Sequence, residues 1–88
     1  MLLFKRFKEE KMDMNKDRRS RISKLLAILE EIHNSLQTIL DEEQDYFDNM
    51  PENLQGSIRG MNSEEAINIL EETVSLLEET VESLRQIN

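Results

Sequence analysis

The chain has 88 residues, the length of one small domain, which buries only roughly 60 to 65% of the surface that its unfolded chain exposes. It contains no cysteine, which excludes disulfide bonds and thiolate metal sites as sources of stability. With 19 acidic and 11 basic residues, its formal net charge is −8. A chain this short needs stabilisation from elsewhere, so we expect a homo-oligomer, either a homodimer or a larger assembly.

The charge is unevenly distributed along the chain. Residues 1–24 hold nine basic and four acidic residues, whereas residues 25–88 hold two basic and fifteen acidic ones. This polarity favours either a basic arm that contacts an anionic partner or head-to-tail attraction between copies.

Residues 1–14 are interpreted as a dispensable basic extension, because Met12 and Met14 are alternative start sites. The apolar run at residues 1–4 is too short for the core of a signal peptide, and no stretch reaches the ~18 apolar residues of a membrane span. A short helix on a membrane surface is the alternative for this extension, and its length argues against it. We therefore expect a cytoplasmic protein without a membrane span.

Residues 15–88 are predicted to form one helical hairpin. Apolar residues recur at intervals of three and four from Ile22 to Phe47, which predicts a long helix over residues 15–49. No glycine or proline interrupts this stretch before Pro51, and Met50 is disfavoured in helical geometry because it precedes that proline.

A second helix is predicted over residues 63–87, where the capping types Asn62 and Ser63 precede two glutamates. Its seven-residue repeat places two sets of apolar residues at the core positions of a coiled coil: Ile67, Val74 and Val81, and Leu70, Leu77 and Leu84. Further apolar residues widen this face, namely Ile69, Leu76 and Ile87. A face of this width suits a bundle of four or more helices.

Residues 50–62 are predicted to form a structured loop, since a helical hairpin needs only two to five residues to reverse. Pro51 favours a short helical turn, and Gly56 is expected to end that turn in a left-handed conformation. The predicted fold is therefore all-α: a long helix, a loop with a short helical turn and a second helix form an antiparallel hairpin that assembles into a homo-oligomeric helix bundle.

The residue types of catalytic and metal sites are sparse. His33 is the one histidine, and without a second ligand at suitable spacing a half-buried bundle histidine is favoured over a metal-binding or proton-carrying one. Glu43 interrupts the apolar register, and a carboxylate that reaches solvent or pairs with Arg59 is favoured over a buried functional acid. We expect no catalytic residues, no metal and no cofactor, and hence no enzyme.

The loop and its flanks gather aromatic, amide and cationic side chains. These are the candidate binding residues Tyr46, Phe47, Asn49, Asn53, Gln55 and Arg59. In a dimer they could meet the partner's basic arm and form a pocket for a phosphorylated small molecule. The alternative, which we favour, is that the aromatic rings cap the core while the polar groups satisfy the amides of the turn.

A basic cluster near the start of the long helix adds the candidate residues Arg18, Arg19 and Arg21, flanked by Lys16 and Lys24. Such a cluster can bind nucleic acid in a salt-dependent manner. It lacks interleaved aromatic residues, and the acidity of the chain would repel long nucleic acids. Nucleic acid is therefore a disfavoured partner, and a solvated terminus that complements acidic charge is preferred.

Residues 45–60, DYFDNMPENLQGSIRG, followed by a helix that begins AINILEE, resemble small acidic helical proteins of tailed phages and prophages. The resemblance covers roughly residues 15–88 and implies no assigned activity. It implies a protein that occupies a host component, with counter-defence as a plausible context.

Together these patterns predict a non-catalytic helical binding protein that blocks or sequesters a host protein or a nucleotide signal in the bacterial cytoplasm. Two alternatives stay open: a structural or assembly protein that works through the acidic coiled coil, and an RNA-binding hairpin dimer.

Overall fold

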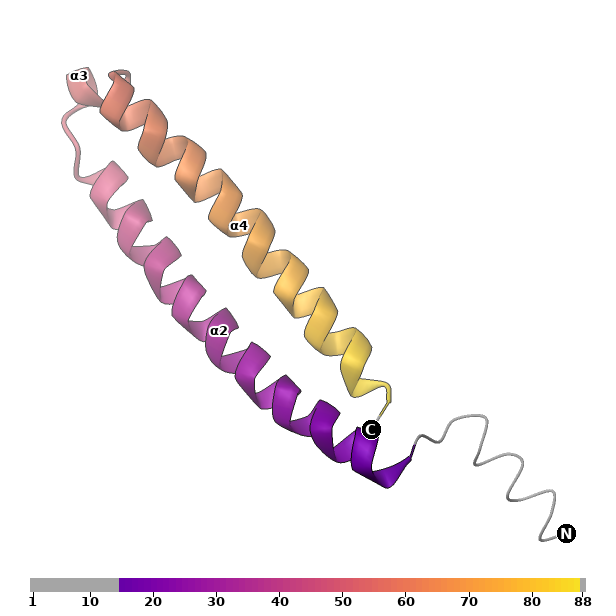
Figure 1. Ribbon diagram of the computed structural model, residues 1–88. Helices are drawn as coiled ribbons and strands as arrows, with labels where there is room; N and C mark the ends of the chain where they lie inside the picture. Colours follow the sequence, from indigo (N-terminus) through magenta and orange to yellow (C-terminus); the bar gives the residue numbers. More distant parts are fainter. Residues whose placement is uncertain (1–14, 88) are drawn as a thin grey trace, which may run out of the picture.

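The computed structural model describes residues 15–87, which form an antiparallel pair of long helices (Figure 1). Helix α2 spans Lys16–Asp48, the short helix α3 spans Glu52–Gln55, and helix α4 spans Ile58–Arg85. These three helices and their caps account for all the described residues except Met50 and Ile87, so the all-α hairpin with a helical turn in its loop is confirmed. The basic extension predicted at residues 1–14 lies outside the described residues.

Helix α2 begins where the sequence predicts. The Asn15 side chain caps it by accepting hydrogen bonds from the backbone N–H groups of Asp17 at 2.8 Å and Arg18 at 3.3 Å. At the other end, the Asn49 N–H donates to the carbonyl of Asp45 at 3.0 Å, and the chain then turns into Pro51. With 33 residues, α2 is about 50 Å long.

Helix α4 begins at Ile58, well before the predicted start at residue 63, so the boundaries predicted for the loop were wrong. Ser57 is the cap, and its Oγ accepts a hydrogen bond from the Gly60 N–H at 3.3 Å. Gly60 fell within the predicted loop, but it lies inside α4, where the close approach of α3 requires a glycine. A Cβ there would lie 2.1 Å from the Gln55 carbonyl oxygen, so Gly60 lets α3 pack closely on α4.

The prediction that a glycine in a left-handed conformation ends α3 is also wrong. Gly56 has a φ of −85°, a conformation that any residue adopts. The turn instead closes through the Gln55 side chain, whose Nε2 donates to the carbonyls of Phe47 at 3.2 Å and Met50 at 3.1 Å. These bonds satisfy the Met50 carbonyl and add to the bond that the Phe47 carbonyl accepts from the Met50 N–H at 3.1 Å.

The core is a narrow seam between α2 and α4. Its buried apolar residues are Leu26, Met50, Ile67, Val74 and Val81. The core register predicted for the second helix is confirmed, since its isoleucine and valine positions are buried and its leucine positions are half-buried. Among residues 15–87 no large side chain is fully buried, because two helices enclose a seam from two sides only.

Candidate functional site

The two helices face each other along a repeating pattern that defines two flanks of the hairpin. In α2 the seam residues include Leu26, His33, Leu40 and Phe47, spaced seven apart, and in α4 they include Ile67, Val74 and Val81. Residues that precede the seam residues by one position or follow them by two lie on one flank, and residues that follow them by four lie on the other. Because the helices are antiparallel, equal offsets in α2 and α4 fall on the same side of the hairpin.

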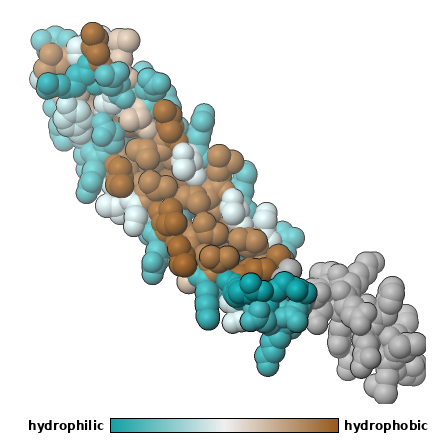
Figure 2. Space-filling model, in the orientation of Figure 1, coloured by the Kyte–Doolittle hydropathy of each residue, from teal (hydrophilic) through white to brown (hydrophobic). Residues whose placement is uncertain are grey.

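One side of the hairpin is apolar and exposed to solvent. On α2 its members are Leu25 (55% exposed), Ile28 (50%), Ile32 (43%), Ile39 (48%) and Tyr46 (48%). On α4 they are Ile69 (56% exposed) and Leu76 (61%). We call these seven residues the apolar face. Figure 2 looks onto it and shows a brown, hydrophobic strip that runs along both helices.

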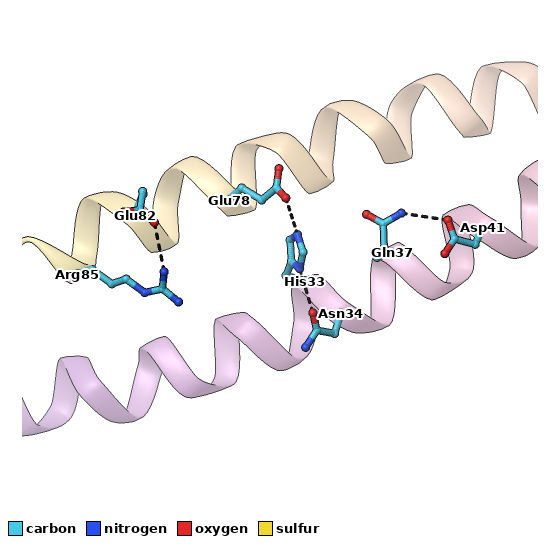
Figure 3. Close-up of polar contacts among 7 residues, drawn as sticks. All are labelled: His33, Asn34, Gln37, Asp41, Glu78, Glu82 and Arg85. Atoms are coloured by element: carbon cyan, nitrogen blue, oxygen red, sulfur yellow. Dashed lines mark hydrogen bonds and ion pairs between the residues drawn. The ribbon is translucent and has the colours of Figure 1, made fainter.

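The other side, here called the polar face, is held together by interhelical polar contacts (Figure 3). His33 Nε2 lies 3.1 Å from Glu78 Oε2, which joins α2 to α4 near the middle of the hairpin. Nearer the open end, the Arg85 guanidinium donates to Glu30 at 2.8 Å and to Glu82 at 3.2 Å. These residues and Asn34 line an open groove between the helices. His33, Glu78, Glu30, Glu82 and Arg85 are therefore partnered within one chain.

The surroundings of His33 raise its pKa above the ordinary value of 6.5. The largest cause is the hydrogen bond with Asn34 Oδ1 at 3.2 Å, followed by the hydrogen bond with Glu78. Both partners offer oxygen acceptors, which favour the protonated ring. With 22% of its side chain exposed, His33 is the half-buried bundle histidine that the sequence favours.

Glu43 is half-buried at the loop end of the seam and is held by Ser63, not by Arg59. The Ser63 hydroxyl donates to Glu43 Oε2 at 2.5 Å, and Ser63 itself is 5% exposed. A charge-assisted bond of this length satisfies the carboxylate where it leaves the apolar register. The ion pair suggested with Arg59 is not formed within residues 15–87.

The candidate binding residues around the loop lie in different structural environments. Tyr46 belongs to the apolar face, Phe47 is half-buried in the seam, and Asn49 caps α2. Gln55 hydrogen-bonds to the carbonyls of the turn, as the favoured alternative for the loop expects. Asn53 on α3 and Arg59 in the first turn of α4 are both exposed.

The candidate residues of the basic cluster lie in the first turns of α2. Arg18 and Arg21 are exposed, with Arg21 paired to Asp17 at 3.0 Å, while Arg19 is half-buried. Arg21 and Phe47 are separated by about 39 Å of helix. The basic cluster and the loop residues therefore stand at opposite ends of one chain, and the hairpin does not bring them together.

The apolar face is the feature that sequence reasoning located incompletely. The widened face of the second helix was identified, but the apolar residues of the first helix, from Ile22 to Phe47, were treated as one face. Leu25, Ile32 and Ile39 were therefore not separated from the seam. The signal that separates them is their offset by one position from the seam residues, a set that repeats every seven residues.

Two further findings concern the part of the chain that the structure describes. Within residues 15–87, no three histidine, aspartate or glutamate side chains lie close enough together to hold a metal ion. Helices α2, α3 and α4 each lack the length or the apolar character needed to cross a membrane.

No protein-family model, no curated protein and no solved structure matches this chain.

Proposed function

We propose that the protein is a non-catalytic helical binding module that acts by occupying another macromolecule at a fixed stoichiometry. One observation carries the proposal: the hairpin leaves an apolar face uncovered along both helices. Clustered apolar surface of this kind marks an interaction site, since apolar side chains gain free energy when a partner removes them from water.

The shape of the face suits a helical partner. Its five α2 residues follow a spacing that a second helix can pack against, with side chains of one helix fitting between those of the other. On the polar face His33 and Arg85 already contact glutamates of the same chain, which leaves less for these groups to gain from a partner.

In this proposal the two ends of the hairpin contact the host component that the protein binds. The loop residues and the basic cluster lie outside the apolar face, apart from Tyr46, and carry exposed amide and guanidinium groups. They would contact the host protein or nucleotide signal that is blocked or sequestered.

Photo-crosslinking in living bacteria tests the role of the face. A photoreactive residue at Ile32, on the apolar face, is expected to yield adducts of defined mass, because its partner lies within contact distance. The matched control places the same residue at Glu31, which is exposed on the outer side of α2. Adducts at position 31 and none at position 32 would contradict the proposal.

RNA binding is a second candidate function, favoured by the exposure of Arg18 and Arg21 in the first turns of α2. It predicts salt-dependent RNA binding that weakens when both arginines are replaced by glutamine. Binding that is insensitive to salt and to these replacements would remove this candidate.

A further inference from the structure

We infer that a second copy of this chain covers the apolar face, in an antiparallel arrangement that places α2 on the partner's α2 and α4 on the partner's α4. The inference rests on the proposed function, in which this face is an interaction surface. The inference adds that the partner of the apolar face is a second copy of the chain and that this copy packs antiparallel to the first.

The apolar face consists of one stripe of residues on α2 and another on α4. The lengths of these two stripes determine which helix of the second copy each helix can pack against. The stripe on α2 extends from Leu25 to Tyr46, about 32 Å, whereas the stripe on α4 extends from Ile69 to Leu76, about 10 Å. If two copies packed in parallel about a two-fold axis along the hairpin, α2 would face the partner's α4. The ends of the long stripe would then contact polar residues, among them Ser83 and Asn62.

Antiparallel packing matches each stripe with itself. On α2, Leu25 then meets the partner's Tyr46, and Ile32 meets the partner's Ile39, because the stripe has the same spacing in both directions. On α4, Ile69 meets the partner's Leu76. Six of the seven residues of the apolar face gain an apolar neighbour at the same level, and Ile28 falls level with Glu43 of the partner.

A single two-fold axis can pass through the centres of both stripes. The α2 stripe is centred between Ile32 and Ile39, and the α4 stripe is centred between Ile69 and Leu76. Both centres lie between the same two interhelical contacts, His33 with Glu78 and Glu43 with Ser63. The two stripes are therefore centred at a similar level of the hairpin, as an axis across it requires.

The charges at the loop end and the open end of the hairpin also favour antiparallel packing. The loop end, residues 41–65, carries eight acidic residues and one basic residue. The open end, residues 16–24 together with 78–87, carries six basic and four acidic residues. Parallel packing would bring two acidic loop ends together, whereas antiparallel packing sets each acidic end against a basic cluster.

This arrangement unites groups that one chain keeps apart. With Leu25 of one copy against the partner's Tyr46, the turn of α2 that holds Arg18 and Arg21 comes level with residues 50–53 of the partner. Each end of the assembly would then combine the basic cluster of one copy with the loop residues of the other. The candidate binding residues would form two composite surfaces, each incomplete in a single chain.

Distances between spin labels on the full-length protein test the inference. The chain lacks cysteine, so Ser20→Cys and Ser35→Cys each introduce a single labelling site at an exposed serine. Antiparallel packing predicts that labels at position 20 of two copies lie about 45 Å apart along the helices, while labels at position 35, near the axis, lie within about 20 Å.

The other outcomes are distinct from one another. Short distances at both positions would mean parallel packing, which overturns the inference and leaves the proposed function standing. No intermolecular distance at either position would mean that a second copy is not the occupant. The crosslinking comparison of Ile32 with Glu31 would then decide separately whether the face binds another protein.

Discussion

The polar face and the apolar face of the hairpin are formed by the same two helices. They differ in whether their side chains find partners within one chain. On the polar face, His33 contacts Glu78 and Arg85 contacts Glu30, so charged groups find their partners within one chain. On the apolar face, side chains such as Leu25 and Leu76 remain more than half exposed. The polar face therefore joins α2 to α4 through contacts within one chain, whereas the apolar face leaves apolar side chains in contact with solvent.

The largest expected effect comes from placing a charge on the apolar face. Ile39→Glu should weaken self-association at least about a hundredfold, because an unpaired carboxylate in an apolar interface costs several kcal/mol. Analytical ultracentrifugation over a range of concentrations measures this change. The control Thr38→Glu adds the same charge one residue away, on the exposed outer side of α2, and should leave association nearly unchanged. Equal effects of the two variants would contradict the assignment of the face.

The turn that joins the two long helices should be the next most sensitive region. Gly60→Ala should destabilise the fold by about 2 to 3 kcal/mol, because the new Cβ would clash with the backbone of Gln55. Gly56→Ala is the matched control: nothing lies within 4 Å of its Cβ position and its φ suits alanine, so it should be neutral or stabilising by up to ~1 kcal/mol. Chemical denaturation at one fixed protein concentration compares them, and a tolerated Gly60→Ala would refute the close packing of α3 on α4.

A smaller effect is expected at the polar contact inside the seam. Ser63→Ala removes the hydroxyl that donates to Glu43 and should cost about 1 to 2 kcal/mol, since the half-buried carboxylate loses its partner. Ser75→Ala, at an exposed serine of the same helix, should change stability by less than about 0.5 kcal/mol. If the two variants unfold at the same denaturant concentration, the Ser63 contact contributes nothing.

The smallest effect is the pH dependence of the polar face. Because the pKa of His33 is raised, its contribution to stability is fully present below the ordinary histidine pKa of 6.5 and is lost as the pH rises through the higher value in the folded state. The thermal midpoint of the native chain should exceed that of His33→Gln at about pH 5.5, and the difference should shrink at about pH 8.5. A difference that grows with pH would reverse the sign and contradict the contact with Glu78.

The sequence predicted the hairpin well because its helices carry regular patterns. The three-and-four spacing from Ile22 to Phe47 and the seven-residue repeat at Ile67, Val74 and Val81 each specify one helix and its buried side. The start of α4 was missed because Ser57 and Gly60 are loop residue types, and only the close approach of Gln55 explains why a glycine belongs inside that helix.

The candidate site was less predictable, because its members are defined by tertiary placement. Gln55 was identified as a binding residue by its type, yet its amide is committed to the carbonyls of Phe47 and Met50. Ser63 was read as a cap and instead lies buried against Glu43. The separation of Arg21 from the loop follows from the length of α2, but whether a second copy closes that gap depends on an interface that one sequence does not contain.

The most direct test of the central claim is the mass of the full-length protein in solution, measured by light scattering at several concentrations. If the apolar face is covered by a second copy, the mass should be twice the 10.4 kDa of one chain or a higher even multiple, and Ile39→Glu should reduce it. A mass of one chain at every concentration would show that the face is not covered by self-association and would contradict the account.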